Sequence, residues 1–174
     1  MQKEHEVLWE GRFIRTVRQG QWEYVQRHNN NGVVGIVPIT DTDEIVLIEQ
    51  WRIPLGKHVI ELPAGLSGDE TDTSDEALID AAKRELLEET GYEATDWKSV
   101  GNGASSAGLT DEVISLYIAR DLRKVGNGGG DGTEDIRVHV IKLHHAQQWL
   151  MNQESEGKAI DVKVYAGLYF VATT

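Results

Sequence analysis

The stretch that decides the fold is EALIDAAKRELLEETGY, residues 76–92. Its apolar residues recur at the spacing of one face of an α-helix, and they are Ala77, Leu78, Ala81, Ala82 and Leu86. The preceding Asp72-Thr73-Ser74 offers side chains that cap a helix N-terminus, and Gly91 offers the residue that commonly ends one. The sequence therefore predicts an amphipathic helix over Glu76–Thr90.

Three glutamates continue the apolar face of this helix. On a helical wheel Glu85, Glu88 and Glu89 fall with the apolar side chains, whereas Asp80 and Lys83 fall on the opposite side. Carboxylates in the last turn oppose the helix dipole by roughly 0.3–1 kcal/mol each, and carboxylates clustered near a core repel one another unless a cation is present. Oxygen ligands without Cys or His suit Mg²⁺ or Mn²⁺ better than Zn²⁺. The alternative is a solvated acidic face beyond the edge of the core.

The pattern Glu76-x7-Arg84-Glu85-Leu86-x-Glu88-Glu89-x-Gly91-Tyr92 resembles the Nudix box from its first glutamate onward. Ahead of it, Glu61-Leu62-Pro63-Ala64-Gly65 resembles the lead-in of the ADP-ribose and nucleoside diphosphate sugar pyrophosphatase branch. The first glycine of the box would fall at position 70, which is Glu70, so Gly65 is the better counterpart. An insertion within Leu66–Asp75 therefore lengthens the loop before the helix.

The resemblance implies a metal site and a role for each box residue. The carbonyl of Ala64 and the carboxylates of Glu85 and Glu89 would hold Mg²⁺ (or Mn²⁺), and Glu88 would assist or bind a further ion. Arg84 would orient these carboxylates through charge-assisted hydrogen bonds; its alternative role is a surface partner of Asp80 or Glu88.

A candidate catalytic base follows the box. The segment SAGLTDE, residues 106–112, is similar to a loop of this branch in which a glutamate activates water, and Glu112 falls on that glutamate. Ala107 replaces a proline typical of ADP-ribose specialists, which leaves the substrate open. Alternatively Glu112 only opens a strand, and Glu134 and Asp135 are then the reserve candidates.

Substrate contacts are implied mainly by the N-terminal segment. Trp22-Glu23-x-x-x-Arg27 resembles a segment in which the aromatic residue stacks on the base and polar residues grip base and phosphates. Phe13 matches a second stacking aromatic, and Arg52 of Gln50-Trp51-Arg52 could pair with a phosphate. The alternative for Trp22 is ordinary hairpin packing.

Composition fits one soluble domain with a sizeable core. The chain has 174 residues, 40% of them hydrophobic, and lacks both cysteine and any apolar run long enough to span a bilayer. A formal net charge of −12 argues against nucleic-acid binding. These features predict a cytoplasmic protein without membrane or nucleic-acid partners.

The order of elements predicts an α/β protein. Strands are expected at Phe13–Arg18, Trp22–His28, Val33–Ile39, Glu44–Glu49, His58–Leu62, Val113–Ala119 and Ile136–Leu143, and further helices at His144–Asn152 and Val162–Ala172. The run Gly126–Gly132 contains five glycines and is expected to be a flexible loop. The resemblance implies a Nudix α/β/α sandwich with a mixed sheet over residues 32–174. It also implies that the N-terminal antiparallel strands of residues 1–31 serve dimerisation and substrate binding in a homodimer.

Together these features predict a metal-dependent hydrolase that converts ADP-ribose, or a related nucleoside diphosphate sugar, to a nucleoside monophosphate and a sugar phosphate. A pyrophosphatase for GDP-mannose, UDP-sugars or dinucleoside polyphosphates is the alternative within enzymes. A sensor that binds nucleotide sugars without cutting them is the alternative from another class, although every box carboxylate is present.

Overall fold

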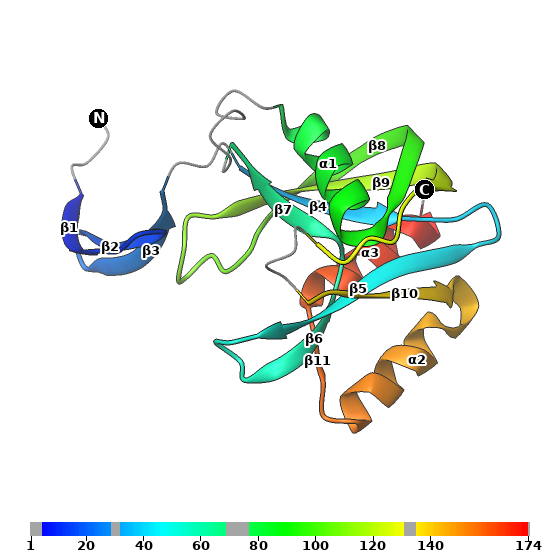
Figure 1. The fold of residues 1–174 in the computed structure, drawn as a ribbon. Coiled ribbons are helices and arrows are strands. Elements are labelled where there is room, and N and C mark those ends of the chain that lie inside the picture. Colours follow the sequence, from blue (N-terminus) through cyan, green and yellow to red (C-terminus); the bar gives the residue numbers. More distant parts are fainter. Residues whose placement is uncertain (1–4, 29–31, 69–76, 131–134, 174) are drawn as a thin grey trace.

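The computed structural model describes residues 5–28, 32–68, 77–130 and 135–173. An N-terminal antiparallel sheet is built from β1 (Glu6–Glu10), β2 (Ile14–Gln19) and β3 (Trp22–Arg27). Figure 1 shows this sheet standing apart from the rest of the chain. Its attachment is local: the Val25 amide donates to the Leu109 carbonyl over 2.8 Å, and Val25 forms a β-bridge with Thr110.

Two four-stranded mixed sheets form the body of the molecule. The first has the order β7 (Ala64–Ser67), β4 (Gly32–Pro38), β9 (Val113–Lys124) and β8 (Tyr92–Ala104), and only β4 and β9 run parallel. The second has the order β10 (Arg137–Lys142), β5 (Glu44–Arg52), β6 (Lys57–Glu61) and β11 (Ala159–Ile160), and only β6 and β11 run parallel.

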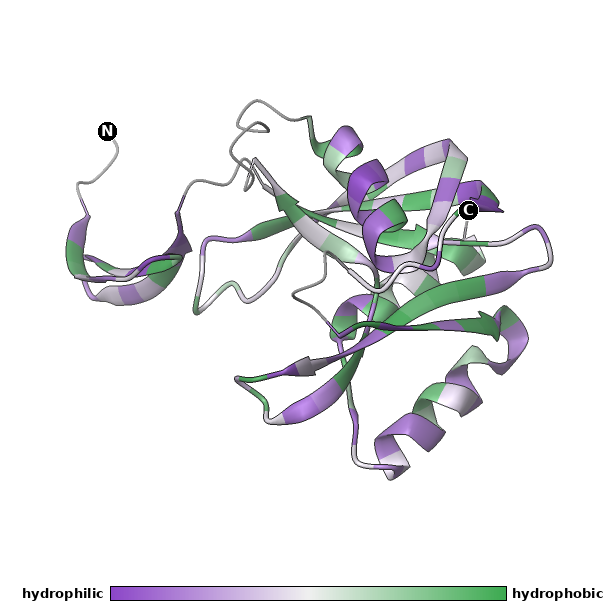
Figure 2. Ribbon diagram, viewed as in Figure 1, coloured by the Kyte–Doolittle hydropathy of each residue, from purple (hydrophilic) through white to green (hydrophobic). Residues whose placement is uncertain are grey.

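Three helices cover these sheets. The helix α1 (Leu78–Thr90) packs on the first sheet, where Ala81, Ala82 and Leu86 lie against β4 and β9. The helix α2 (Leu143–Ser155) lies along the second sheet, and α3 (Val162–Thr173) contacts strands of both sheets. Apolar residues dominate the central strands, whereas α1 and α2 alternate hydrophobic and hydrophilic residues (Figure 2). The predicted α/β class, the mixed sheet and the N-terminal antiparallel strands are confirmed.

Most expected elements are present, and the missed ones are short or lie at edges. The strands β1, β7, β8 and β11 were not expected. The strand β8 is an edge strand that is mostly exposed and pairs only with β9, so it lacks the apolar alternation that identifies a strand in a sequence. The strands β7 and β11 have four and two residues, too few for any periodicity.

The start of α1 differs from the expectation. The helix begins at Leu78 with Ala77 at the N-cap, and no side chain among the described residues caps it. Glu76, Glu70 and Asp72-Thr73-Ser74 lie outside the described residues. The predicted end is confirmed, because Gly91 adopts the left-handed conformation (φ 70°) and its amide donates to the Leu87 carbonyl over 2.8 Å.

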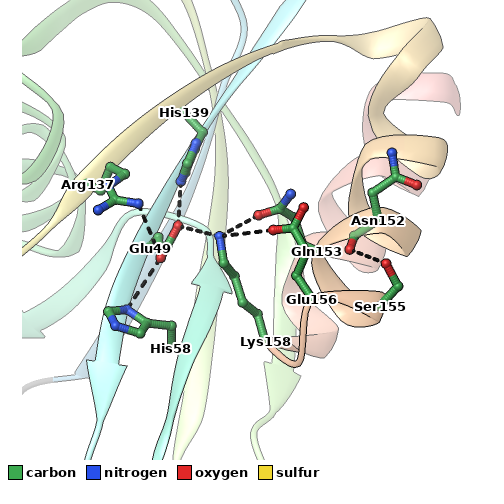
Figure 3. A network of polar contacts seen from close by, with 9 residues as sticks. All are labelled: Glu49, His58, Arg137, His139, Asn152, Gln153, Ser155, Glu156 and Lys158. Atoms are coloured by element: carbon green, nitrogen blue, oxygen red, sulfur yellow. Dashed lines mark hydrogen bonds and ion pairs between the residues drawn. The ribbon is translucent and has the colours of Figure 1, made fainter.

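A cluster of ionisable side chains around the buried Glu49 joins the second sheet to the turn before β11 (Figure 3). Glu49 of β5 is buried and accepts from Lys158 Nζ at 3.0 Å and from His139 Nε2 at 2.8 Å. His58 of β6 and Arg137 of β10 lie 3.4 and 3.8 Å from the same carboxylate. Burial opposes ionisation, but the contacts from Lys158 and His139 hold the Glu49 pKa below its usual value. Lys158 is thereby fixed immediately before β11, which leads directly into α3.

Candidate active site

The glutamates of α1 face inward as their phase predicts. Only 9% of Glu85 and 3% of Glu89 is exposed, whereas Glu88 is half-buried. Asp80 and Lys83 are exposed and pair with each other on the opposite side. A solvated acidic face is therefore wrong for Glu85 and Glu89.

Arg84 ties these carboxylates to the neighbouring strand. Its Nη1 donates to Glu85 Oε1 at 2.9 Å and to Glu88 Oε2 at 3.1 Å, while its Nη2 donates to the Leu66 carbonyl at 3.0 Å. The bond to Leu66 connects α1 to β7, the strand that directly follows Pro63. Because the guanidinium is partly buried and shared by two carboxylates, it fixes their orientation. A surface pair with Asp80 is not formed, because Asp80 binds Lys83.

The segment Ala64-Gly65 lies directly against the acidic side chains. The Ala64 amide donates to Glu89 Oε2 over 2.9 Å. A Cβ atom built on Gly65 would lie 1.9 Å from Glu85 Oε1. Any residue other than glycine at position 65 would therefore displace the Glu85 carboxylate. Glycine at position 65 therefore allows β7 and α1 to approach closely enough to place the Ala64 backbone beside Glu85 and Glu89.

One pocket of about 360 Å³ brings together most of the predicted site residues. Its lining includes Ala64, Arg84, Glu85, Glu88, Glu89, Glu112, Arg27, Gln50, Arg52 and Lys163. Carboxylates from α1 thus share the pocket with cationic groups from three other parts of the chain. This combination suits an anionic ligand held through both a metal ion and direct contacts to basic side chains.

The candidate base reaches the pocket from the start of β9. Glu112 is largely buried and its Oε2 accepts from Arg27 Nε at 2.6 Å. A second contact between the same segments joins Gln26 and Asp111. The N-terminal sheet of the same chain therefore contributes Arg27 to the pocket and touches the loop that carries Glu112.

Arg52 is held in place by a buried carboxylate. Its Nε donates to Glu61 Oε1 at 2.8 Å, and its Nη2 pairs with the other oxygen of the same group. Gln50 Nε2 also donates to Glu61 Oε2, at 3.2 Å. These contacts fix the position of the Arg52 guanidinium at the pocket.

The remaining predicted substrate residues lie elsewhere in the N-terminal sheet. Trp22 and Phe13 are 62% and 66% exposed and do not line the pocket of their own chain. Glu23 pairs with Arg18 on the surface. Of the reserve bases, Asp135 is exposed and Glu134 lies outside the described residues.

Lys163 lines the pocket without having been predicted to do so. It lies in the first turn of α3, where its amide donates to Asp161 Oδ1 over 2.7 Å and its ammonium pairs with Asp161 Oδ2. Asp161 thus caps the helix and holds the lysine. The Asp-x-Lys spacing at the start of an expected helix is the signal that could have revealed it.

The donor set at this site fits a hard divalent cation. Two buried carboxylates, Glu85 and Glu89, lie beside the Ala64-Gly65 backbone, which a glycine allows to approach, and carboxylate and carbonyl oxygens suit such an ion. In the part of the chain that the structure describes, no three His, Asp or Glu side chains converge as a preformed metal site. Glu85, Glu89 and the Ala64 carbonyl are the groups that could hold a metal here, together with water or substrate.

Comparison with known proteins identifies the family. The NUDIX domain model matches residues 30–161. The chain belongs to the Nudix family. It is 34% identical to a methanol dehydrogenase activator of Bacillus methanolicus, covering 83% of this chain and 80% of the relative. It is 31% identical to an ADP-ribose pyrophosphatase of Escherichia coli O6:H1, covering 87% and 69%.

The fold has a counterpart among solved structures. A crystal structure described as an ADP compounds hydrolase superposes with a TM-score of 0.72 at 22% identity, covering 98% of this chain and 90% of that one. The predicted family and its ADP-ribose pyrophosphatase branch are confirmed, and the protein is a Nudix hydrolase. Within the described residues, no helix of this Nudix hydrolase is long and apolar enough to cross a bilayer.

Proposed function

We propose that this Nudix hydrolase cuts the diphosphate of ADP-ribose or a related nucleoside diphosphate sugar, using Mg²⁺ (or Mn²⁺). The single observation that carries the proposal is the pocket in which Glu85, Glu89 and Ala64 lie with Glu112 and four cationic side chains. Sequence relatives described as ADP-ribose pyrophosphatases support the choice of substrate class.

In this proposal the metal and the side chains of the protein have separate roles in the reaction. A bound divalent ion would supply neutralisation of the phosphate charge and polarisation of the attacked group. Glu85, Glu89 and the Ala64 carbonyl would hold it, and Glu88 would bind or steady a further ion. Arg84 keeps Glu85 and Glu88 oriented through the contacts at 2.9 and 3.1 Å.

Glu112 accepts the proton of the attacking water in this proposal. The water oxygen forms a bond to one phosphorus, and the bond from that phosphorus to the bridging oxygen breaks. The electron pair stays on the bridging oxygen, which leaves as part of the second phosphate. The products are a nucleoside monophosphate and a sugar phosphate.

The cations of the pocket neutralise the substrate. Three of these cations are each held by a carboxylate. Glu61 holds Arg52, Asp161 holds Lys163, and Glu112 holds Arg27. Each of these side chains already pairs with a carboxylate, so each lies in a defined position before a diphosphate enters. Because the chain as a whole carries a net charge of −12, such local cations are needed to attract an anionic substrate.

The N-terminal segment, residues 1–31, completes the site in a homodimer under this proposal. Trp9, Phe13 and Trp22 are exposed apolar residues of a sheet that stands apart from the body of the chain. Apolar residues gathered in this way favour contact with another surface. A second copy would cover them and could present Phe13, Trp22 or Glu23 to the partner's nucleotide.

A panel of substrates tests the proposal. ADP-ribose, GDP-mannose, UDP-glucose and a dinucleoside polyphosphate are incubated with the protein and Mg²⁺, with and without chelator, and the products are separated by chromatography. The proposal expects chelator-sensitive release of a nucleoside monophosphate from ADP-ribose. Faster cleavage of GDP-mannose or UDP-glucose would select the alternative that Ala107 leaves open. Binding of every nucleotide sugar without cleavage of any would contradict the hydrolase and support a sensor.

A further inference from the structure

The C-terminal end of α1 is enclosed by a segment that the proposed chemistry does not use. This segment, which we call the helix clamp, consists of Lys124 and residues Gly126, Gly128, Gly129 and Gly130. It begins at Lys124, the last residue of β9, and continues along the last turn of α1. It was expected to be a flexible loop, but over Gly126–Gly130 it is bonded to the helix; residues 131 and 132 lie outside the described residues.

Every carbonyl of the last helical turn has a hydrogen-bond donor. The Leu87 carbonyl accepts from the Gly91 amide at 2.8 Å. The carbonyls of Glu88 and Glu89 accept from the amides of Gly130 and Gly129 at 3.1 and 2.9 Å. The Thr90 carbonyl accepts from Lys124 Nζ at 2.6 Å. These are the four groups that a helix leaves without internal partners, and here the clamp satisfies three of them.

The clamp places a positive charge at the negatively charged end of this helix. Glu85, Glu88 and Glu89 lie near the negative end of the helix dipole, and the last turn of α1 contains no basic residue. The ammonium of Lys124 supplies the missing positive charge from β9. It also lies 4.6 Å from the centre of the Tyr92 ring. Partial burial of the amine lowers the pKa of Lys124.

Close backbone approach requires glycine at two positions of this contact, Gly128 of the clamp and Gly91 at the end of α1. A Cβ atom on Gly128, whose φ is +70°, would lie 2.5 Å from the Thr90 carbonyl carbon and 2.6 Å from the Glu89 oxygen. A Cβ atom on Gly91 would lie 2.3 Å from the Gly126 oxygen. By contrast, a Cβ atom on Gly126 would meet nothing nearer than 3.8 Å. The backbone at the end of α1 and the backbone of the clamp thus pack in close contact.

We propose that the helix clamp positions the metal-binding carboxylates of α1, with Lys124 as its decisive positioning residue. The amides of Gly129 and Gly130 bind the backbone of Glu89 and Glu88 themselves, so a shift of the clamp moves the residues whose side chains line the pocket. This inference rests on the proposed function only in assigning Glu85 and Glu89 to the metal.

The test measures metal binding directly. Mn²⁺ binding to the full-length protein is followed from the electron paramagnetic resonance signal of the free ion, beside melting temperature and turnover. We expect K124M to raise the Mn²⁺ dissociation constant by about tenfold, as losses of groups that orient metal ligands do, and K124R to recover most of the affinity. The matched control is R123M, because Arg123 is a neighbouring cation that pairs with Glu93 at the surface. G128A should weaken Mn²⁺ binding as K124M does, whereas G126A should not.

The outcomes separate the clamp from the metal site. A folded K124M protein that binds Mn²⁺ within twofold of wild type overturns the clamp while leaving the proposed function intact. Equal weakening in R123M overturns it as well. A wild-type protein that binds no Mn²⁺ contradicts the metal site, and the clamp's role with it. Should K124M fail to fold, amide hydrogen exchange in the wild-type protein decides the matter. The amides of Gly129 and Gly130 must then exchange slowly and become slower with Mg²⁺; exchange unaffected by Mg²⁺ overturns the proposal.

Discussion

Replacing Arg84 by Met removes the group that joins the acidic residues of α1 to β7. The hydrogen bonds lost within the described residues include those to Glu85, Glu88 and the Leu66 carbonyl. Hydrogen bonds of charged groups contribute about 1.5–3 kcal/mol each when buried. The side chain of Arg84 is 19% exposed and that of Glu88 37% exposed, so water compensates part of the loss. We expect the metal-free protein to lose about 2–3 kcal/mol, which lowers the melting temperature by about 4–12 °C.

Thermal unfolding in the presence of a chelator measures this effect. The matched control is Lys83→Met, since Lys83 lies one position away in α1 and pairs with the exposed Asp80, so its loss should stay within about 0.5 kcal/mol. A double-mutant cycle with Glu85→Gln should show coupling of at least about 1 kcal/mol, because the two side chains are in direct contact. Equal melting temperatures for Arg84→Met and Lys83→Met, or additive losses in the cycle, would refute the role given to Arg84.

Two further predictions concern the base and the buried cluster of the second sheet. Glu112→Gln should lower kcat by about 10²–10⁴-fold with little change in KM, because the amide oxygen can still accept a hydrogen bond from Arg27 but the amide cannot take a proton from water. An increase in KM alone would mean that Glu112 only positions Arg27. The second prediction follows from the Glu49 pKa, which lies below the ordinary value of 4.5 in the folded protein. Its contribution to stability is therefore complete above about pH 4.5 and is lost as the pH falls through the folded pKa. Urea unfolding between pH 3 and 7 should show this loss in the wild type and a flatter profile in Glu49→Gln; identical profiles would contradict the assignment.

The sequence predicts α1 well because one residue pattern sets both the buried face of the helix and the position of its glutamates. The apolar phase places Ala82 and Leu86 in the core, and the same phase places Glu85 and Glu89 beside them. Since helical geometry is local, a window of fifteen residues contains all the information needed. The strands with continuous apolar runs, β4 and β5, were predictable for the same reason.

The features that could not be predicted depend on pairing between distant segments. The exposed edge strand β8 is fixed by its ladder with β9, and β11 by two residues of β6. Lys163 lines the pocket from the start of α3, directly after β11, whose place depends on its pairing with the distant strand β6. The glycine-rich segment after β9 was predicted to be flexible, because no local sequence pattern indicates that its amides donate hydrogen bonds to the carbonyls at the end of α1.

The central claim is that the buried carboxylates of α1 bind the metal that makes hydrolysis possible. The most direct measurement compares Mg²⁺-dependent turnover of ADP-ribose by wild type, Glu85→Gln and Glu89→Gln, with Glu93→Gln as a surface control. We predict losses of about 10²-fold or more in the two α1 variants, with melting temperatures showing that both remain folded, and an unchanged rate in Glu93→Gln. Wild-type rates in both α1 variants would contradict the claim.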